Sequence, residues 1–273
     1  MIAQRYWSAC GARLSRLGTR LLLAGTLALS AAGFGGVLGA TEVEGCIACH
    51  RDSQFLVTNK KLYDYYRLWE VSVHGQEDTG CSDCHGGNPA AKDKEEAHRG
   101  AALPGGKMTS PVNYQNIPKT CGQCHEEIYK HYTTSKHYKK LLEGAKAGKP
   151  IGPNCVTCHG SVNTGVLNVR TVRDTCQKCH NRENDNHPDT PDRAEEMLNE
   201  FLSVHRYYRY LTVRGDRAAS QDFYRRVENE TDDLMMFWHS FDLDAIGKRT
   251  HALITVLKEK RNDLLQMLRK KEK

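Results

Sequence analysis

Five copies of one short cysteine and histidine pattern stand out in this 273-residue sequence. Each copy reads Cys-x-x-Cys-His, a spacing typical of covalent attachment of a c-type haem. In such a motif the two thiols form thioether bonds to the haem, and the histidine binds the iron as its proximal ligand. The sequence therefore predicts five covalently bound haem c groups. The motif residues are Cys46, Cys49 and His50; Cys81, Cys84 and His85; Cys121, Cys124 and His125; Cys155, Cys158 and His159; and Cys176, Cys179 and His180.

Two other uses of paired cysteines fit the sequence less well. Zinc ribbons also contain Cys-x-x-Cys pairs, but they do not need a histidine after every second cysteine. Disulfide bonds would suit an exported chain. However, every cysteine after Cys10 lies in one of the five motifs, so none is left over for a separate disulfide framework.

Eight histidines lie outside the motifs and are candidates for the second axial position on the irons. A low-spin electron-transfer haem uses two strong axial ligands, and histidine–methionine ligation raises the potential relative to two histidines. Because the chain has only six methionines, we expect bis-histidine haems. The strongest candidates for distal ligands are His74, His137 and His98, followed by His239 and His205, and then by His131; His187 and His251 are most simply solvent-facing.

An internal repeat places two of these histidines at equivalent positions. In the first copy an aromatic-rich stretch leads to Ser72-Val73-His74 and then to the motif at Cys81. In the second copy a similar stretch leads to Ser135-Lys136-His137 and then to the motif at Cys155. Both of these motifs continue with glycine. The chain is therefore expected to use a two-haem unit twice, with the fifth haem appended.

This repeat resembles the multihaem cytochromes related to the tetrahaem cytochrome c of ammonia oxidisers and to hydroxylamine oxidoreductase. The resemblance covers residues 45–182 and includes the stretch from Cys84 to Pro89 with the following Ala97-His98. It implies that a histidine on a helix before one haem motif is the distal ligand of a neighbouring haem. This chain has five motifs where hydroxylamine oxidoreductase has eight haems, and no tyrosine here matches that enzyme's cross-linking tyrosine. The resemblance therefore predicts the fold but not the catalytic activity.

The N-terminus has the pattern of an export signal. Four arginines precede an uncharged stretch from Leu21 to Ala40, and residues 1–40 contain no acidic residue. A basic region followed by an apolar one is typical of a signal peptide. Cleavage near residue 40 is expected; the alternative is an uncleaved membrane anchor, since about twenty apolar residues just span a bilayer. The protein is thus expected in the periplasm or outside the cell, with membrane association if the signal is kept.

Three zones follow from the distribution of the motifs. Residues 1–40 are the export signal, residues 41–188 the pentahaem domain, and residues 189–273 a segment without haem. The haem pairs occupy 41–100 and 119–160, the fifth motif lies at 176–180, and a loop over 101–118 contains glycine and proline. Because little polypeptide is available for each haem, we expect a mainly α fold with little regular structure around a covalent haem core, and no conventional apolar core there.

The haem-free segment is expected to be helical. Thr190 is the expected cap of its first helix, with Pro191 in the first turn. Gly215 ends this helix, Asp216 caps the next one, and Asp242 starts the third. Apolar residues at near-heptad spacing in the third helix predict a packing face made of Leu243, Ile246, Leu253, Leu257, Leu264 and Met267. These helices are expected to pack on the haem core or on a second copy of the chain. His205 lies on an apolar face here, which a buried structural histidine would explain equally well.

The charge of the chain argues against nucleic acid as a partner. Without residues 1–40 the 39 Lys and Arg fall by four to 35, against 33 acidic residues, and haem propionates add further negative charge.

The leading interpretation is an exported electron carrier between redox proteins, such as a quinol-linked donor and a terminal reductase or extracellular acceptor. One alternative is a small reductase or oxidase of a nitrogen or sulfur compound with one open haem. Another is a subunit of a cytochrome filament or of a membrane-anchored quinol dehydrogenase.

Overall fold

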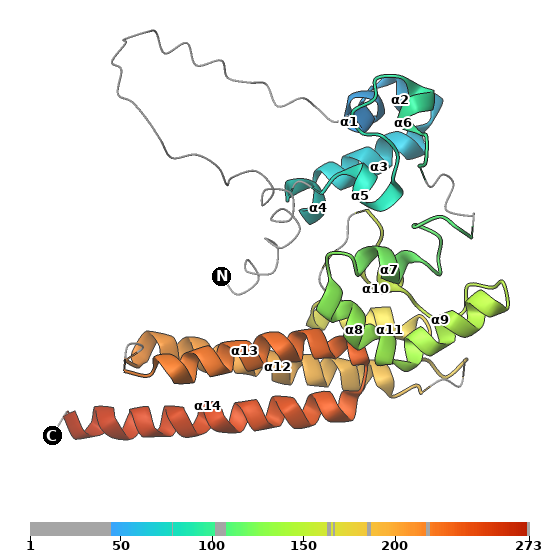
Figure 1. The fold of residues 1–273 in the computed structure, drawn as a ribbon. Coiled ribbons are helices and arrows are strands. Elements are labelled where there is room, and N and C mark those ends of the chain that lie inside the picture. Colours follow the sequence, from blue (N-terminus) through green and yellow to red (C-terminus); the bar gives the residue numbers. More distant parts are fainter. Residues whose placement is uncertain are drawn as a thin grey trace, which may run out of the picture. The chain divides into compact units, whose positions relative to one another are not determined.

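A computed structural model describes residues 45–77, 79–101, 108–162, 165, 167–184, 187–216 and 219–271. All regular elements in these residues are helices, and no strand occurs among them (Figure 1). The chain divides into two compact units, Met1–Val112 and Asn113–Lys273. The expected export signal and Cys10 lie outside the described residues. Within the described ranges, no helix is both long enough and apolar enough to cross a membrane.

The first unit carries the first two motifs on short helices. No apolar side chain is buried among its described residues; only Ser72 and Ser110 are. Several of its apolar side chains face outward, and Val57 is 88% exposed. This unit therefore builds no apolar core from its own described side chains. Its helices are α1 (Gly45–His50), α2 (Gln54–Thr58), α3 (Lys60–Glu70), α4 (Val73–Gln76), α5 (Cys81–His85) and α6 (Lys94–Ala97).

The second unit begins with a region of short helices that carries the other three motifs. Its buried apolar side chains are few and include Tyr132, Leu141 and Val172. As in the first unit, few residues of this region form a conventional apolar core. The helices are α7 (Ile117–Cys121), α8 (Glu126–Thr134), α9 (Lys136–Lys146), α10 (Cys155–His159) and α11 (Val169–Gln177).

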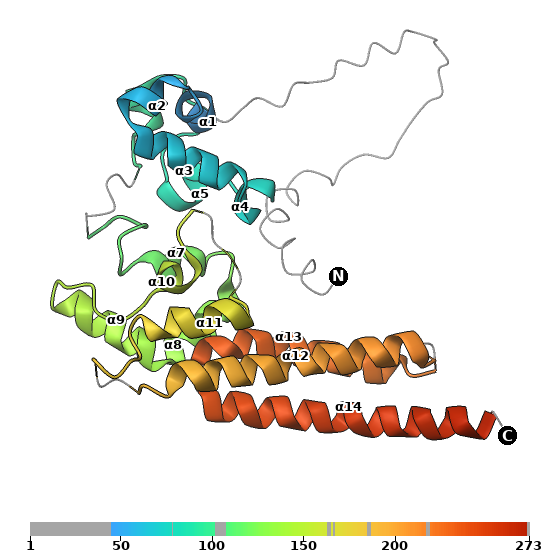
Figure 2. The ribbon, with the colours of Figure 1, turned by 180° about the vertical axis from the view of Figure 1, so that it is seen from behind.

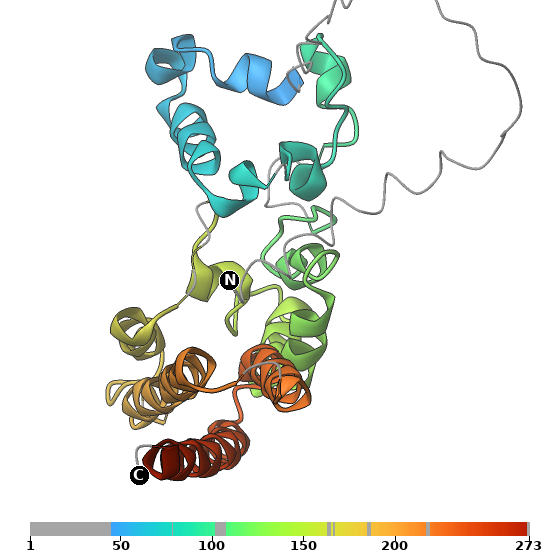
Figure 3. The same ribbon diagram turned by 90° about the vertical axis from the view of Figure 1, so that its left-hand side faces the viewer.

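Three long helices complete the second unit, as the sequence predicts. They are α12 (Thr190–Arg214), α13 (Gln221–Phe237), which continues into the short 3-10 helix η4 (Trp238–Ser240), and α14 (Leu243–Lys271). Helix α14 runs alongside both α12 and α13 (Figures 1 and 2), and Figure 3 views these helices nearly end-on. Their contact surfaces form an apolar core made of Val204, Leu211, Tyr224, Val227, Leu253, Ile254, Leu257 and Leu264.

The helix ends agree with the prediction at two places and differ at two others. Helix α12 ends before Gly215, and Asp242 accepts a hydrogen bond from the Ala245 N–H (3.0 Å) at the start of α14. Thr190, however, is the first helical residue of α12 and not its cap. Asp216 accepts from the Ala219 N–H (3.1 Å) in a turn that precedes α13, because a short polar side chain can satisfy a local turn as well as a helix end.

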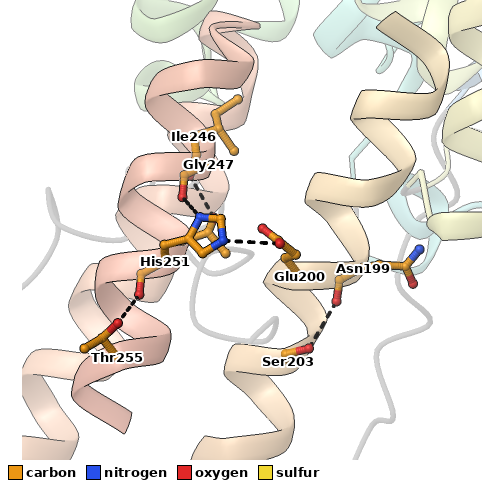
Figure 4. Close-up of polar contacts among 8 residues, drawn as sticks. Asn199, Glu200, Ser203, Ile246, Gly247, His251 and Thr255 are labelled. Atoms are coloured by element: carbon orange, nitrogen blue, oxygen red, sulfur yellow. Dashed lines mark hydrogen bonds and ion pairs between the residues drawn. The ribbon is translucent and has the colours of Figure 1, made fainter. Parts of the chain in front are cut away.

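Polar contacts also join α12 to α14. His251 Nε2 lies 3.3 Å from Glu200 Oε1, and its Nδ1 lies 2.9 Å from the Gly247 carbonyl (Figure 4). Nearer the start of both helices, Arg193 donates to Asp244 at 2.5 Å. The His251 side chain is 63% exposed, in agreement with its expected solvent-facing position. The His251–Glu200 and Arg193–Asp244 pairs connect the two long helices at the surface, whereas the contact of His251 with Gly247 lies within α14.

The long helices pack directly on the motif-bearing part of their own unit. Helix α12 packs on α11, while α13 and η4 pack on α8. Packing on the haem region is one of the two arrangements expected from the sequence. The long helices thus support the region that contains the third, fourth and fifth motifs.

Candidate functional site

The attachment motifs lie on short helices or at their ends. Helices α1, α5 and α10 each contain a complete motif. The third and fifth motifs begin near the ends of α7 and α11 and continue into the following turn. Residues three and four positions apart face the same side of a helix. A single helical turn therefore presents both thiols and the histidine of a motif on one side, as attachment to one haem requires.

The second and fourth motifs share a detailed local structure. Both helices are followed by a glycine with positive φ, Gly86 (71°) and Gly160 (85°). Glycine adopts this left-handed region without the penalty that a side chain would cause. At the other end, the N–H of Gly80 donates to Asp83 Oδ2 (2.8 Å) and that of Asn154 to Thr157 Oγ1 (3.1 Å). The sequence repeat is thus also a structural repeat.

The two Ser-x-His triplets have equivalent geometry as well. Ser72 and Ser135 are the N-caps of α4 and α9, where their hydroxyls accept hydrogen bonds from backbone N–H groups at 3.1 and 3.0 Å. His74 and His137 are consequently the second residue of their helices. The triplets are evident in the sequence, but the capping role of the serines was not predicted, although a serine before a helical stretch indicates a cap.

Three motif histidines have a histidine from outside the motifs beside them. The ring centroids lie 6.3 Å apart for His50 and His98, 6.0 Å for His159 and His239, and 5.9 Å for His180 and His137. Two imidazoles on opposite sides of one metal ion have centroids roughly 6 Å apart, given metal–nitrogen bonds of about 2 Å and about 1 Å from nitrogen to ring centre. All three separations therefore fit two histidines on one iron.

For three of these imidazoles, those of His137, His239 and His50, burial favours the neutral form, which is the form that binds metal ions. Burial, followed by the neighbouring His180, lowers the pKa of His137 to about 4. Burial is also the main cause that lowers the pKa of His239 to about 4. For His50, burial and then the nearby imidazoles of His98 and His85 lower the pKa.

The fifth motif has two histidines close to its own. In addition to His137, the ring of His187 lies 6.4 Å from that of His180. His187 is exposed and has φ of 47°, which is uncommon for a residue with a side chain. From the sequence His187 was expected to face solvent, and its position in the chain gives no signal of this contact.

The remaining candidates lie in other surroundings. His74 is half-buried on α4, and burial lowers its pKa. His205 packs against Phe201 with ring centroids 5.3 Å apart; burial lowers its pKa, and nearby Asp232 partly opposes this. His131 packs against Phe237 at 5.4 Å. The described ring contacts of His205 and His131 thus join them to phenylalanines and not to motif histidines.

Two cysteines from different motifs touch each other. Cys121 and Cys155, the first cysteines of the third and fourth motifs, are hydrogen-bonded through their thiols; this bond raises the pKa of Cys121 and lowers that of Cys155. Burial raises the pKa of Cys158 to about 11. The two attachment points at Cys121 and Cys155 therefore lie side by side.

The surroundings of the motifs fit a large apolar cofactor. The described residues of the first unit bury no apolar side chain, although two attachment motifs lie there. In addition, the Nδ1 atoms of His85 and His137 are buried without a hydrogen-bond partner. A porphyrin at each motif would supply the apolar surface that these helices need to pack against. On these grounds the residues fit covalent haem.

Comparison with known proteins agrees with this interpretation. Residues 63–143 match the family described as cytochrome c552, and residues 107–181 match the family described as cytochrome c7 and related cytochrome c. The two matched ranges together include the second to fifth motifs and both Ser-x-His triplets. No solved structure matches the chain. The motifs and the two matches show that the chain carries multihaem cytochrome c domains.

Proposed function

We propose that this protein is an exported electron carrier with five covalent haems, whose irons have two histidine ligands each. The observation that carries the proposal is the set of three histidine pairs at 5.9–6.3 Å. Each pair combines one motif histidine with one histidine from elsewhere in the same unit. An iron with both axial positions filled can exchange electrons but has no open position for a substrate.

The pairs suggest a specific ligand assignment. His98 is the distal ligand of the iron at His50, His239 of the iron at His159, and His137 of the iron at His180. We prefer His137 to His187 at the last iron because His137 is more deeply buried and matches His74 in the repeat. His74 is accordingly the proposed distal ligand of a further iron, with His205 and then His131 as the remaining candidates.

The protein's own residues do the holding and the shielding. Haem c, when bound, supplies one-electron redox chemistry. The thiols fix each haem covalently, and paired imidazoles exclude substrates and water from the irons. Cys121 and Cys155 lie next to each other, so the third and fourth haems would be attached at adjacent points, which favours a short path for electrons between them.

The cellular role follows from the class of protein. c-type cytochromes are typically exported, and we propose that this one works in the periplasm or outside the cell. Its partners would be redox proteins, namely a quinol-linked donor and a terminal reductase or extracellular acceptor. The closer relation to the tetrahaem cytochrome of ammonia oxidisers is part of this proposal. Pairing of two copies through the long helices is a further part of it.

Substitution of the proposed distal ligands tests the function. His98→Ala, His137→Ala and His239→Ala should each convert one of the five haems from low to high spin, measured by electron paramagnetic resonance of the oxidised protein. His251→Ala is the matched control, because His251 is exposed and pairs with Glu200. The proposal fails if the three variants keep the spin states of the unsubstituted protein.

A further inference from the structure

An aromatic side chain makes the same long-range hydrogen bond in both copies of the repeat. Trp69 Nε1 donates to the Thr79 carbonyl at 2.9 Å, and the Tyr132 hydroxyl donates to the Pro153 carbonyl at 2.6 Å. Each donor lies three residues before the serine of its triplet. Each acceptor lies two residues before the first cysteine of the motif that follows.

The same aromatic residue is also bonded to the serine of its copy. The Ser72 hydroxyl donates to the Trp69 carbonyl, and the Ser135 hydroxyl donates to the Tyr132 carbonyl, both at 2.6 Å. Each serine also caps the helix of His74 or His137. Three consecutive hydrogen bonds, through the serine and the aromatic residue, therefore connect the histidine helix to the residue two positions before the next haem motif. We call this set of residues the aromatic latch: Trp69, Ser72 and Thr79 in the first copy, and Tyr132, Ser135 and Pro153 in the second.

The two latches share their hydrogen bonds but not their rings. An indole makes the bond in one copy and a phenol in the other, so the donor at this position is what the copies have in common. In the second copy Tyr132 and Ser135 are buried, with 6% and 2% exposed, and Pro153 is half-buried. The hydrogen bond from Tyr132 to the Pro153 carbonyl is partly buried, and a hydrogen bond in such surroundings is costly to lose.

We propose that Trp69 and Tyr132 are positioning residues that hold the distal histidines His74 and His137 at a fixed orientation. This inference rests on the proposed bis-histidine function. In the second copy the latch ties α9, which carries the proposed ligand of the iron at His180, to α10, which carries the fourth motif. The latch therefore fixes the attachment of one haem relative to the distal ligand of the next.

The test removes one hydroxyl group and observes one iron. The low-spin resonance that disappears in His137→Ala identifies the iron that His137 ligates. In Tyr132→Phe the g-values of that same resonance and the reduction potential of that haem should shift, while the other resonances stay in place. Trp69→Phe should shift a different resonance. A loss of stability alone would not move the resonance of a single haem.

Tyr114→Phe is the matched control. The Tyr114 hydroxyl donates to the Gly152 carbonyl at 2.5 Å, next to Pro153, but Tyr114 does not belong to the latch. This variant should leave the resonance at His137 unchanged. If the Tyr132→Phe protein does not acquire its haems, Ser135→Ala is the second variant. It removes the hydrogen bond from the Ser135 hydroxyl to the Tyr132 carbonyl and should shift the same resonance.

Failure of the latch differs from failure of the proposed function. If His137→Ala removes no low-spin resonance, the ligand assignment itself is wrong. If His137→Ala removes one but Tyr132→Phe and Ser135→Ala leave its g-values and potential unchanged, the assignment stands and the latch is wrong. An equal shift in Tyr114→Phe would also overturn the latch.

Discussion

Removing the haem attachments of the first unit is predicted to unfold that unit alone. The perturbation is the substitution of its four motif cysteines with alanine in the full chain, at Cys46, Cys49, Cys81 and Cys84. Its helices have between 4 and 11 residues, fewer than the roughly 12–15 at which isolated helices become marginally stable in water. Its described residues bury no apolar side chain that would compensate.

The size of the effect follows from the helix lengths. Helices α1 to α6 contain about a quarter of the α-helical residues described, so far-ultraviolet circular dichroism should lose about a quarter of its helical signal. Hydrogen exchange should become fast over 45–101. Helices α12 to α14 should stay protected, because burying each apolar side chain of their core contributes about 1.5–3 kcal/mol.

A complementary variant provides the control. Alanine at Cys155, Cys158, Cys176 and Cys179 leaves the first unit with its haems, so exchange over 45–101 should stay slow. The reasoning is refuted if residues 45–101 keep slow exchange in the variant without haem in the first unit. Such a result would mean that these helices are stable without a porphyrin core.

Three further predictions concern single features. Phe241 has φ of 56° and its ring lies 4.3 Å from His137 and 6.3 Å from His239. Phe241→Gly should relieve about 1–2 kcal/mol of left-handed strain. Because the ring contacts both His137 and His239, its loss should also shift the low-spin resonances of their two irons together. The prediction is wrong if neither resonance shifts. Gly86→Ala should lower the free energy of unfolding by about 1–2 kcal/mol in denaturant titrations. Gly86 has a positive φ, and the Gly100 carbonyl would lie 3.1 Å from the new Cβ. Gly165→Ala is the control and should leave the free energy of unfolding unchanged, because a Cβ at Gly165 would meet nothing within 4 Å. Intact mass should show a chain that starts near residue 40 and carries five haems; four or fewer in mature protein would contradict the cofactor count.

Much of the fold is accessible from the sequence because its signals are local. The attachment motifs occupy single helical turns, and the apolar periodicity of residues 189–271 predicts the long helices. In α14 the expected face is largely buried, including Ile246, Leu253 and Leu257, although Met267 is 51% exposed. The expected loop over 101–118 contains the boundary between the two units, and α7 starts at its end.

The arrangement of the histidines is much less accessible. His239 lies 80 residues after His159, and no local pattern indicates that their rings meet. The approach of His187 to His180 and the left-handed backbone of Phe241 likewise depend on tertiary packing. Helix caps fall between these cases, because Thr190 and Asp216 each have a polar neighbour close in sequence, and local hydrogen bonds such as that of Asp216 to Ala219 are not specified by residue type alone.

Electron paramagnetic resonance of the oxidised, unsubstituted protein tests the central claim most directly. Five irons with two histidine ligands each should give low-spin ferric signals only, and the reduced protein should bind little carbon monoxide. One stoichiometric high-spin haem that binds carbon monoxide, nitrite or hydroxylamine would contradict the electron-carrier account and favour an enzyme with an open haem.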